Sequence, residues 1–309
     1  MIKNIIIITL FLFQLNIIIA SEESSLKLKI NDEQPISLNR FFQTVMPGKT
    51  LAFEVEANNI DNIVVKNDFG KIVNKGNGKW NYVASDISGN YEIIILDTVS
   101  NNSIILNVFV LTPLSEMVGE YLNGYRIGNY PEDNFKGKKN YKKPQGLIEV
   151  TKENKNIYIS PHFQLKQFLC KQSSGWPKYL LINPKLLLKL EFILGELNSM
   201  GIEASTIFIM SGYRTPYYNQ SIGNVKFSRH VFGDAAEIYV DNNLDGVMDD
   251  LDGNGKSEMA DAMIMHSIIS KMDNNPDNEH LVGGMGKYNK NSAHTYFIHV
   301  DTRGYKARW

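Results

Sequence analysis

The stretch SRHVFGDAAEIYVD, which runs from Ser228 to Asp241, holds residue types that can bind a metal ion. It places His230 seven positions before Glu237, with two alanines directly before the glutamate. Near the end of the printed sequence, YFIHVD contributes a second histidine, His299. Two imidazoles and one carboxylate are ligands of Zn²⁺, and such a set leaves a fourth position for water, as in catalytic zinc sites.

Two short strands must position these side chains. If AAEIYV is a strand, alternation places Glu237 on one of its faces. If YFIHVD is a strand, His299 and Asp301 share a face. Should the strands be neighbours, Glu237 and His299 point into one cleft, and His230 on the preceding loop closes over the same point. From spacing alone, the alternative that these histidines are ordinary core or surface residues stays open.

Two segments resemble the D-alanyl-D-alanine carboxypeptidase-like family of zinc peptidases: IMSGYRTPYYNQSIGNVKFSRHVFGDAAEIYVD and FIHVDTRGYKARW. SPHFQLKQFLC, near His162, resembles the family's entry to the domain. That family cleaves peptidoglycan stem peptides and shares its zinc core with the hedgehog and lysostaphin-type folds. The resemblance covers residues 156–309. It implies an α+β zinc peptidase domain of the hedgehog/D-Ala-D-Ala-peptidase type.

The resemblance also implies roles for individual residues. Zinc would be held by His230, Glu237 and His299. Arg214, which follows SGY, would stabilise an oxyanion or a substrate carboxylate, and Ser228 would orient the substrate. Two further residues are expected to shape the cleft, although the first could equally lie in the core: Tyr213 and Asn219.

The acidic ligand departs from the family, in which it is normally aspartate. A glutamate oxygen can bind zinc at about 2.0–2.2 Å. The extra methylene of Glu237 nevertheless requires the backbone or the rotamer to adjust. This departure keeps open a second interpretation, a catalytically inactive protein that binds the cell wall and retains the cleft.

The general base is a second departure. Related enzymes often carry a glutamate three residues before the last ligand or a histidine two before it, where this sequence has Tyr296 and Phe297. Asp301, on the face of His299, is the first candidate for the base, and His294 is the second. The alternatives are that Asp301 orients a ligand or pairs with Arg303, and that the histidine is a solvated loop residue.

The acidic stretch DNNLDGVMDDLDGNGKSEMAD, residues 241–261, indicates a different chemistry. From Asp250, oxygen-bearing side chains alternate, with Gly255 at position six, as in calcium loops. This loop resembles the dockerin type of EF-hand, and an overlapping loop from Asp241 shares Asp252 with it. The predicted calcium ligands are Asp241, Asn243, Asp245, Asp250, Asp252, Asn254 and Asp261. Without a cation these carboxylates would repel one another, but a solvated acidic turn stays open as the alternative.

The rest of the chain divides by pattern. Residues 1–20, MIKNIIIITLFLFQLNIIIA, are typical of a cleaved signal peptide rather than a spanning helix. Residues 21–112 predict a small all-β sandwich, with alternation in LAFEVEA and further strands in YEIIILD and SIILNVFVL. Residues 113–155 predict a linker that packs on the next domain. A leucine-rich helix is expected between Asn183 and Gly201.

Composition limits the class of protein. The formal net charge of -1 gives no reason to expect a nucleic-acid partner. The one cysteine, Cys170, cannot form an internal disulfide.

Together these patterns predict an exported, periplasmic or secreted zinc metallopeptidase with structural calcium. It would cut peptidoglycan stem peptides as a D,D-carboxypeptidase or an endopeptidase, with no stable membrane anchor after signal cleavage. The rival interpretations are the inactive wall-binding protein and a calcium-dependent structural or adhesive module. The sequence determines neither the bond that is cut, nor the ligand of the β-rich region, nor the oligomeric state.

Overall fold

The computed structural model describes residues 26–31, 33–133 and 135–309. The predicted signal peptide, residues 1–20, lies outside the described residues. Within those described ranges, no helix combines the length and the apolar character needed to cross a membrane.

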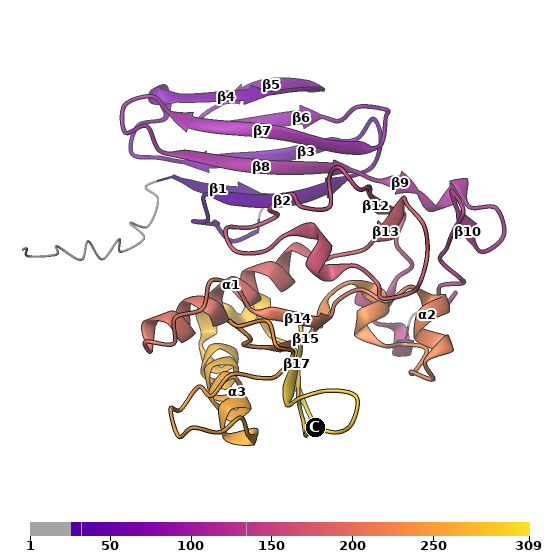
Figure 1. Cartoon of the computed structure of the whole chain (residues 1–309). Coiled ribbons are helices and arrows are strands. Elements are labelled where there is room, and N and C mark those ends of the chain that lie inside the picture. The colour runs from indigo at the N-terminus through magenta and orange to yellow at the C-terminus, as the bar shows by residue number, and fades with distance from the viewer. Residues whose placement is uncertain (1–25, 32, 134) are drawn as a thin grey trace, which may run out of the picture.

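Eight strands near the N-terminus form two four-stranded sheets with the orders β1-β3-β6-β5 and β2-β8-β7-β4 (Figure 1). In β3 the alternation of the sequence is also an alternation of burial, since Leu51, Phe53 and Val55 are buried and Ala52 is exposed. The expected strand in LAFEVEA is therefore confirmed. The strands are β1 (Lys27–Ile30), β2 (Arg40–Val45), β3 (Thr50–Glu56), β4 (Ile63–Asn67), β5 (Lys71–Gly76), β6 (Lys79–Val83), β7 (Gly89–Asp97) and β8 (Ser103–Val110).

The segment expected to be a linker contributes strands and buried side chains. Strands β9 (Thr112–Pro113), β12 (Gly146–Val150) and β13 (Lys178–Leu180) form one sheet, and β10 (Tyr121–Leu122) pairs with β11 (Tyr125–Arg126). A buried cluster joins this segment to the loop that carries His230; its members are Leu114, Leu122, Tyr125, Ile127, Tyr130, Tyr141, Leu147, Tyr179, Val231 and Phe232. A second hydrophobic core runs from the first two sheets into the C-terminal half, so the division at residues 112 and 155 stays a prediction.

The C-terminal half is mixed α+β. Its five-stranded sheet has the order β14-β15-β17-β16-β18. The helix predicted after Asn183 is confirmed as α1. It begins as expected, since the Asn183 side chain accepts a hydrogen bond from the backbone nitrogen of Lys185 at 3.0 Å. The elements are α1 (Pro184–Ser199), β14 (Phe208–Ser211), α2 (Pro216–Ser221), β15 (Ala235–Tyr239), α3 (Met259–Asn274), β16 (Gly284–Tyr288), β17 (Phe297–Asp301) and β18 (Ala307–Arg308).

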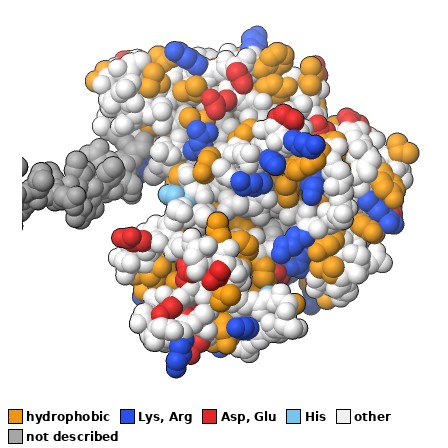
Figure 2. Space-filling view, in the orientation of Figure 1, with side chains coloured by type: hydrophobic (Ala, Val, Ile, Leu, Met, Phe, Trp, Pro, Cys, Tyr) orange, Lys and Arg blue, Asp and Glu red, His pale blue; other side chains and the backbone are white. Residues whose placement is uncertain are grey.

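The parts are arranged in sequence order from one end of the molecule to the other. In Figure 1 the β1–β8 sheets lie at the top, α1 lies below them, and α3 and the C-terminal sheet lie at the bottom. On the same face, Figure 2 shows Lys and Arg side chains gathered around the middle of the molecule.

Cys170 is buried and has a free thiol.

A fully buried lysine ties the helices to the central strand. Lys189 on α1 places its Nζ 3.2 Å from three oxygens: Oδ1 of Asp273 on α3 and the carbonyl oxygens of Leu281 and Asp301. Arg308 on β18 binds the other carboxylate oxygen of Asp273 at 2.5 Å. Burial lowers the pKa of Lys189 from its ordinary value. A buried charge is tolerated only when its donors are all satisfied, so these contacts fix α1 and α3 behind the sheet.

We predict that Lys189→Met lowers the free energy of unfolding by about 3 kcal/mol or more, because it leaves a buried carboxylate with one cation instead of two. Urea denaturation followed by circular dichroism measures this loss. Lys185→Met is the matched control, since its ion pair with Glu33 at 3.3 Å is partly exposed and is worth less than about 1 kcal/mol. Equal losses in both variants would contradict the prediction.

Candidate metal centre

The register of two strands brings two of the predicted metal ligands together. Strands β15 and β17 pair antiparallel, and Glu237 lies directly opposite His299. Side chains of directly opposed residues point to the same face of a sheet. The expectation that these two strands are neighbours is therefore confirmed. Because β14 and β16 flank the pair, both side chains project from the middle of the sheet rather than from an edge.

A tight turn brings the third ligand to the same place. The 3₁₀ turn η6 (Arg229–Phe232) ends at Gly233, which has a φ of 71°. A Cβ on Gly233 would lie 2.5 Å from the carbonyl oxygen of Leu181, so the turn requires a glycine both for its left-handed backbone and for this close approach. The turn places the ring of His230 5.1 Å from the ring of His299.

Hydrogen bonding fixes which nitrogen of His230 is free. Its Nδ1 lies 2.7 Å from the carbonyl oxygen of Gly212. A carbonyl only accepts, so Nδ1 carries the proton and Nε2 presents a lone pair. Burial lowers the pKa of His230 to about 4, and the ring is therefore neutral near pH 7. Its Nε2 is buried without a hydrogen-bond partner among the described residues and lies 3.5 Å from Oε1 of Glu237.

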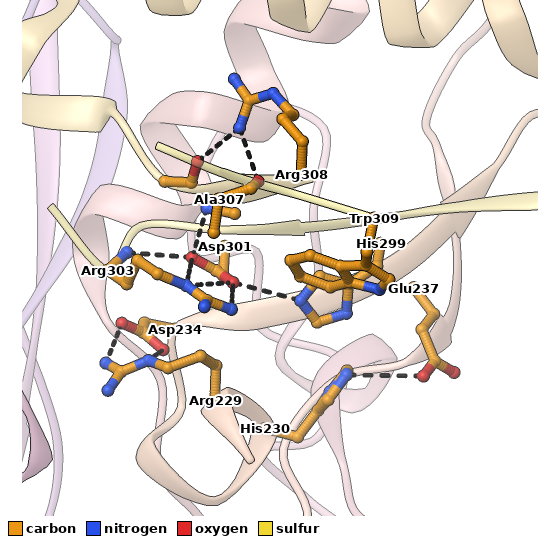
Figure 3. Close-up of polar contacts among 12 residues, drawn as sticks. Arg229, His230, Asp234, Glu237, His299, Asp301, Arg303, Ala307, Arg308 and Trp309 are labelled. Atoms are coloured by element: carbon orange, nitrogen blue, oxygen red, sulfur yellow. Dashed lines mark hydrogen bonds and ion pairs between the residues drawn. The ribbon is translucent and has the colours of Figure 1, made fainter. Parts of the chain in front are cut away.

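This geometry fits a divalent cation. The ligand atoms of His230, Glu237 and His299 lie within 4.8 Å of one another, and Figure 3 shows the three side chains around one point. A buried lone pair facing an ionised carboxylate oxygen is unfavourable unless a positive charge lies between them. Two nitrogens and one oxygen are a donor set that Zn²⁺ accepts. These three residues would hold the ion.

Arg214 contacts the carboxylate ligand directly. Its Nη2 donates to Oε1 of Glu237 at 2.6 Å, and its Nε donates to Oγ of Ser211 at 2.9 Å. Burial raises the pKa of Glu237, but its polar contacts, the Arg214 guanidinium among them, outweigh burial and lower the pKa to about 2. The carboxylate is therefore ionised, as a metal ligand must be.

The three ligands lie in a cleft of about 540 Å³. Ser228 and Arg214, both predicted to face the substrate, line this cleft. Arg303, which the sequence analysis named only as a possible partner of Asp301, also lines it. The remaining lining residues include several that the sequence did not single out: Phe135, Tyr141, Lys226, Phe227, Arg229, Tyr288, Tyr305 and Trp309.

Trp309 forms the wall beside His299, and the sequence interpretation missed it. Its ring lies 5.1 Å from the ring of His299, and its Nε1 donates to the hydroxyl of Tyr288 at 2.7 Å. Gly286 lies opposite His299 in the sheet, and a Cβ there would meet the indole at 2.4 Å. Trp309 does lie inside FIHVDTRGYKARW, which was the only signal for it.

Comparison with known families agrees with the site. Residues 161–259 match a family model described as Peptidase M15. This part of the chain is similar to that family. The resemblance to a family of zinc peptidases that includes D-Ala-D-Ala carboxypeptidases is thereby confirmed. The matched residues contain His230 and Glu237 and end before His299, which the structure adds from β17. The comparisons with curated proteins and with solved structures found no match.

The contacts of Asp301 do not fit the role of general base. Asp301 is fully buried and accepts hydrogen bonds from Gly284 N at 2.7 Å and from Arg303 Nε at 2.9 Å, while its Oδ2 lies 3.2 Å from Nε2 of His299. Burial raises its pKa, but the contacts with His299 and Arg303 outweigh this and hold the pKa well below the usual range. So acidic a group is a poor base at neutral pH. The geometry fits the alternative, in which Asp301 orients His299.

Both ring nitrogens of His294, the second candidate base, already have hydrogen-bond partners. The ring nitrogens of His294 lie 2.8 Å from Nδ2 of Asn291 and 2.8 Å from the carbonyl oxygen of Thr295. Since the carbonyl accepts from Nδ1 and the amide donates to Nε2, neither nitrogen is available. His294 is not among the residues that line the cleft. Its assignment as a base therefore does not fit the structure.

Two residues expected to shape the cleft lie in the interior instead. Tyr213 is 2% exposed, and its hydroxyl lies 2.7 Å from the hydroxyl of Tyr130. Asn219 is 2% exposed, and its Nδ2 donates to the carbonyl oxygen of Val225. The tyrosine belongs to the core, which was the open alternative, and the asparagine holds the loop before Ser228.

The acidic loops fold as two similar turns. Asp250 accepts backbone hydrogen bonds from Gly253, Asn254 and Gly255, the last at 2.6 Å. Asp241 likewise accepts from the backbone nitrogens of the residues four and five positions later, Asp245 and Gly246. Carboxylate oxygens of Asp250, Asp252 and Asp261 lie within 4.8 Å of one another. The asparagines predicted as ligands, Asn243 and Asn254, donate to Asp245 and Asp252.

We predict that Asp301→Asn lowers the zinc affinity of the protein by about 10–100-fold, the usual effect of losing a residue that orients a metal-bound histidine. Competition with a chromophoric chelator measures this affinity. His230→Ala, which removes a ligand, is the control that should abolish zinc binding. If Asp301→Asn binds zinc as tightly as the unchanged protein yet loses turnover, the role of base is restored to Asp301.

Proposed function

We propose that this protein is a zinc-dependent peptidase that hydrolyses peptide bonds in peptidoglycan stem peptides. The coarser statement, a peptidase of a zinc-dependent family, follows from the M15 match. The observation that supports zinc-dependent hydrolysis is the cluster of His230, Glu237 and His299, with its unpaired histidine lone pair, in an open cleft. The choice of peptidoglycan as substrate is supported by the resemblance of the two sequence segments to D-Ala-D-Ala carboxypeptidases. When bound there, zinc would polarise the scissile carbonyl and activate water.

The chain's own residues supply positioning around that point. Arg214 lies beside the ligand carboxylate and lines the cleft, where its guanidinium can stabilise negative charge on the reacting carbonyl or on a substrate carboxylate. Ser228, just before the η6 turn, presents its side chain to the same cleft. The ring of Trp309 lies beside His299 and forms part of the cleft wall. Export is part of the proposal, since the substrate lies outside the cytoplasm and residues 1–20 have a signal-peptide pattern.

The decisive experiment incubates the zinc-loaded protein with purified peptidoglycan and identifies the released fragments by mass spectrometry. We expect shortened stem peptides or free D-alanine from the unchanged protein, and none from His230→Ala. Glu237→Asp restores the family's usual ligand but shortens the side chain, so its zinc content and rate report whether the backbone has adapted to glutamate. If a zinc-loaded protein releases nothing from any wall preparation, the inactive wall-binding interpretation replaces this proposal.

We also infer that the turns at residues 241–261 bind calcium. The support is the convergence of Asp250, Asp252 and Asp261, since three carboxylates this close repel one another unless a cation compensates them. Oxygen donors at alternate positions with a glycine at position six suit Ca²⁺.

We predict that calcium raises the melting temperature of the chelator-treated protein. A ligand that binds only the folded state stabilises it by about 2.7 kcal/mol at one hundred times its dissociation constant. Calorimetry with millimolar calcium measures the shift, and Asp250→Ala should lose it. An identical melting temperature with and without calcium would refute the inference and leave these loops as solvated acidic turns.

A further inference from the structure

Each arginine in the cleft is already neutralised by a carboxylate. Arg214 pairs with Glu237 at 2.6 Å. Arg229 forms a bidentate ion pair with the buried Asp234. Arg303 forms a bidentate ion pair with the buried carboxylate of Asp301, behind His299. These pairs together contribute no net charge to the cleft, so its electrostatic character depends on the remaining ionisable groups.

Two lysines, one lining the cleft and one in contact with a lining residue, form no ion pair with a carboxylate of the described residues. Lys226 lines the cleft, with its Nζ 5.6 Å from the ring centre of Phe227. Lys138 places its Nζ 3.4 Å from the ring centre of Tyr305, another lining residue. Among the described residues, the lysines that form ion pairs lie elsewhere: Lys79, Lys185 and Lys189. The acidic residues at 132 and 133 form no ion pair with either lysine.

The position of these ammonium groups is set by aromatic side chains. Phe135 packs against Phe227, with ring centres 5.1 Å apart, and against Tyr141 at the same distance. These contacts join the lysine-rich segment to the loop that carries His230. An aromatic face holds an ammonium group without neutralising it. The charge of Lys138 is felt at Tyr305, whose pKa is lowered by its contact with that lysine despite partial burial.

We propose that Lys138 and Lys226 bind a carboxylate of the substrate peptide, distinct from the peptide bond that is cut. This assignment rests on the proposed peptidase function and narrows its substrate class to peptides with a free acidic group near the scissile bond. A cation held by His230, Glu237 and His299 adds further positive charge to the cleft, so an anionic substrate is favoured over a neutral one. A substrate with a carboxamide in place of that carboxylate leaves both ammonium groups uncompensated.

The test compares two synthetic stem peptides that differ only in one group, a free carboxylate in the first and a carboxamide in the second. We expect the carboxylate peptide to have a lower KM, with kcat little changed. The variant that combines Lys138→Gln with Lys226→Gln should raise KM for this peptide by about 2–5-fold per lysine, as for partly exposed ion pairs. Its KM for the carboxamide peptide should not change. The matched control combines Lys71→Gln with Lys75→Gln, two exposed lysines on β5.

The dependence of the two KM values on ionic strength provides an independent test. Exposed charges are screened over about 10 Å at 0.1 M salt, so the preference for the carboxylate peptide should shrink as salt is added. Equal KM values for the two peptides in the unchanged protein would overturn the proposal, as would a preference that survives in the double lysine variant. Lys226→Gln alone, at an exposed position, keeps the test valid if the double variant does not fold.

Failure here is distinguishable from failure of the peptidase proposal. If neither peptide is cut, calorimetric binding of the same two peptides to the zinc-loaded protein still measures the preference. A carboxylate preference that depends on the lysines without hydrolysis supports this inference and refutes the peptidase. Hydrolysis of both peptides with equal KM refutes this inference and supports the peptidase.

Discussion

The pairing of β15 with β17 in a single register is the constraint on which the site depends. Glu237 and His299 face each other only because these two positions are directly opposed. A slip of one residue would turn either side chain to the opposite face of the sheet. Both faces of this sheet region are buried, since all five residues of β17 are buried, so a slip would also place a charged or polar side chain in the core.

Buried charge keeps that register in place. Behind His299, the Asp301 carboxylate is held by Arg303, and its backbone oxygen accepts from Lys189 on α1. In front, Arg229 pairs with Asp234 and donates to the carbonyl oxygen of Asn140. Buried ion pairs of this kind add little net stability. Each is satisfied in one geometry only, and any shift of β17 or the η6 turn would leave a charge unpaired.

The resemblance to the peptidase family implied the metal ligands, and strand alternation, which is set by covalent geometry, predicted how two of them are placed. Assigning AAEIYV and YFIHVD as strands was enough to place Glu237 and His299 on matching faces. Roles that depend on packing were not accessible in the same way. Asp301 shares the face of His299, as expected, but its hydrogen bonds come from residues that alternation does not report, and they favour a role in orienting His299. The segment of residues 113–155 was predicted to be a linker, because nothing in its sequence pattern shows that Phe135 and Tyr141 pack against the loop that carries His230.

The glutamate in place of aspartate is explained by its second partner. Oε1 of Glu237 lies 2.6 Å from Nη2 of Arg214 and 3.5 Å from Nε2 of His230. The same oxygen therefore contacts the guanidinium and faces the predicted metal site. Aspartate at this position on β15 would be one methylene shorter and could not span the same distance from the same backbone. The longer side chain therefore links the metal ligand to the arginine expected to face substrate. A metal ion held by His230, Glu237 and His299 would therefore share the Glu237 carboxylate with Arg214.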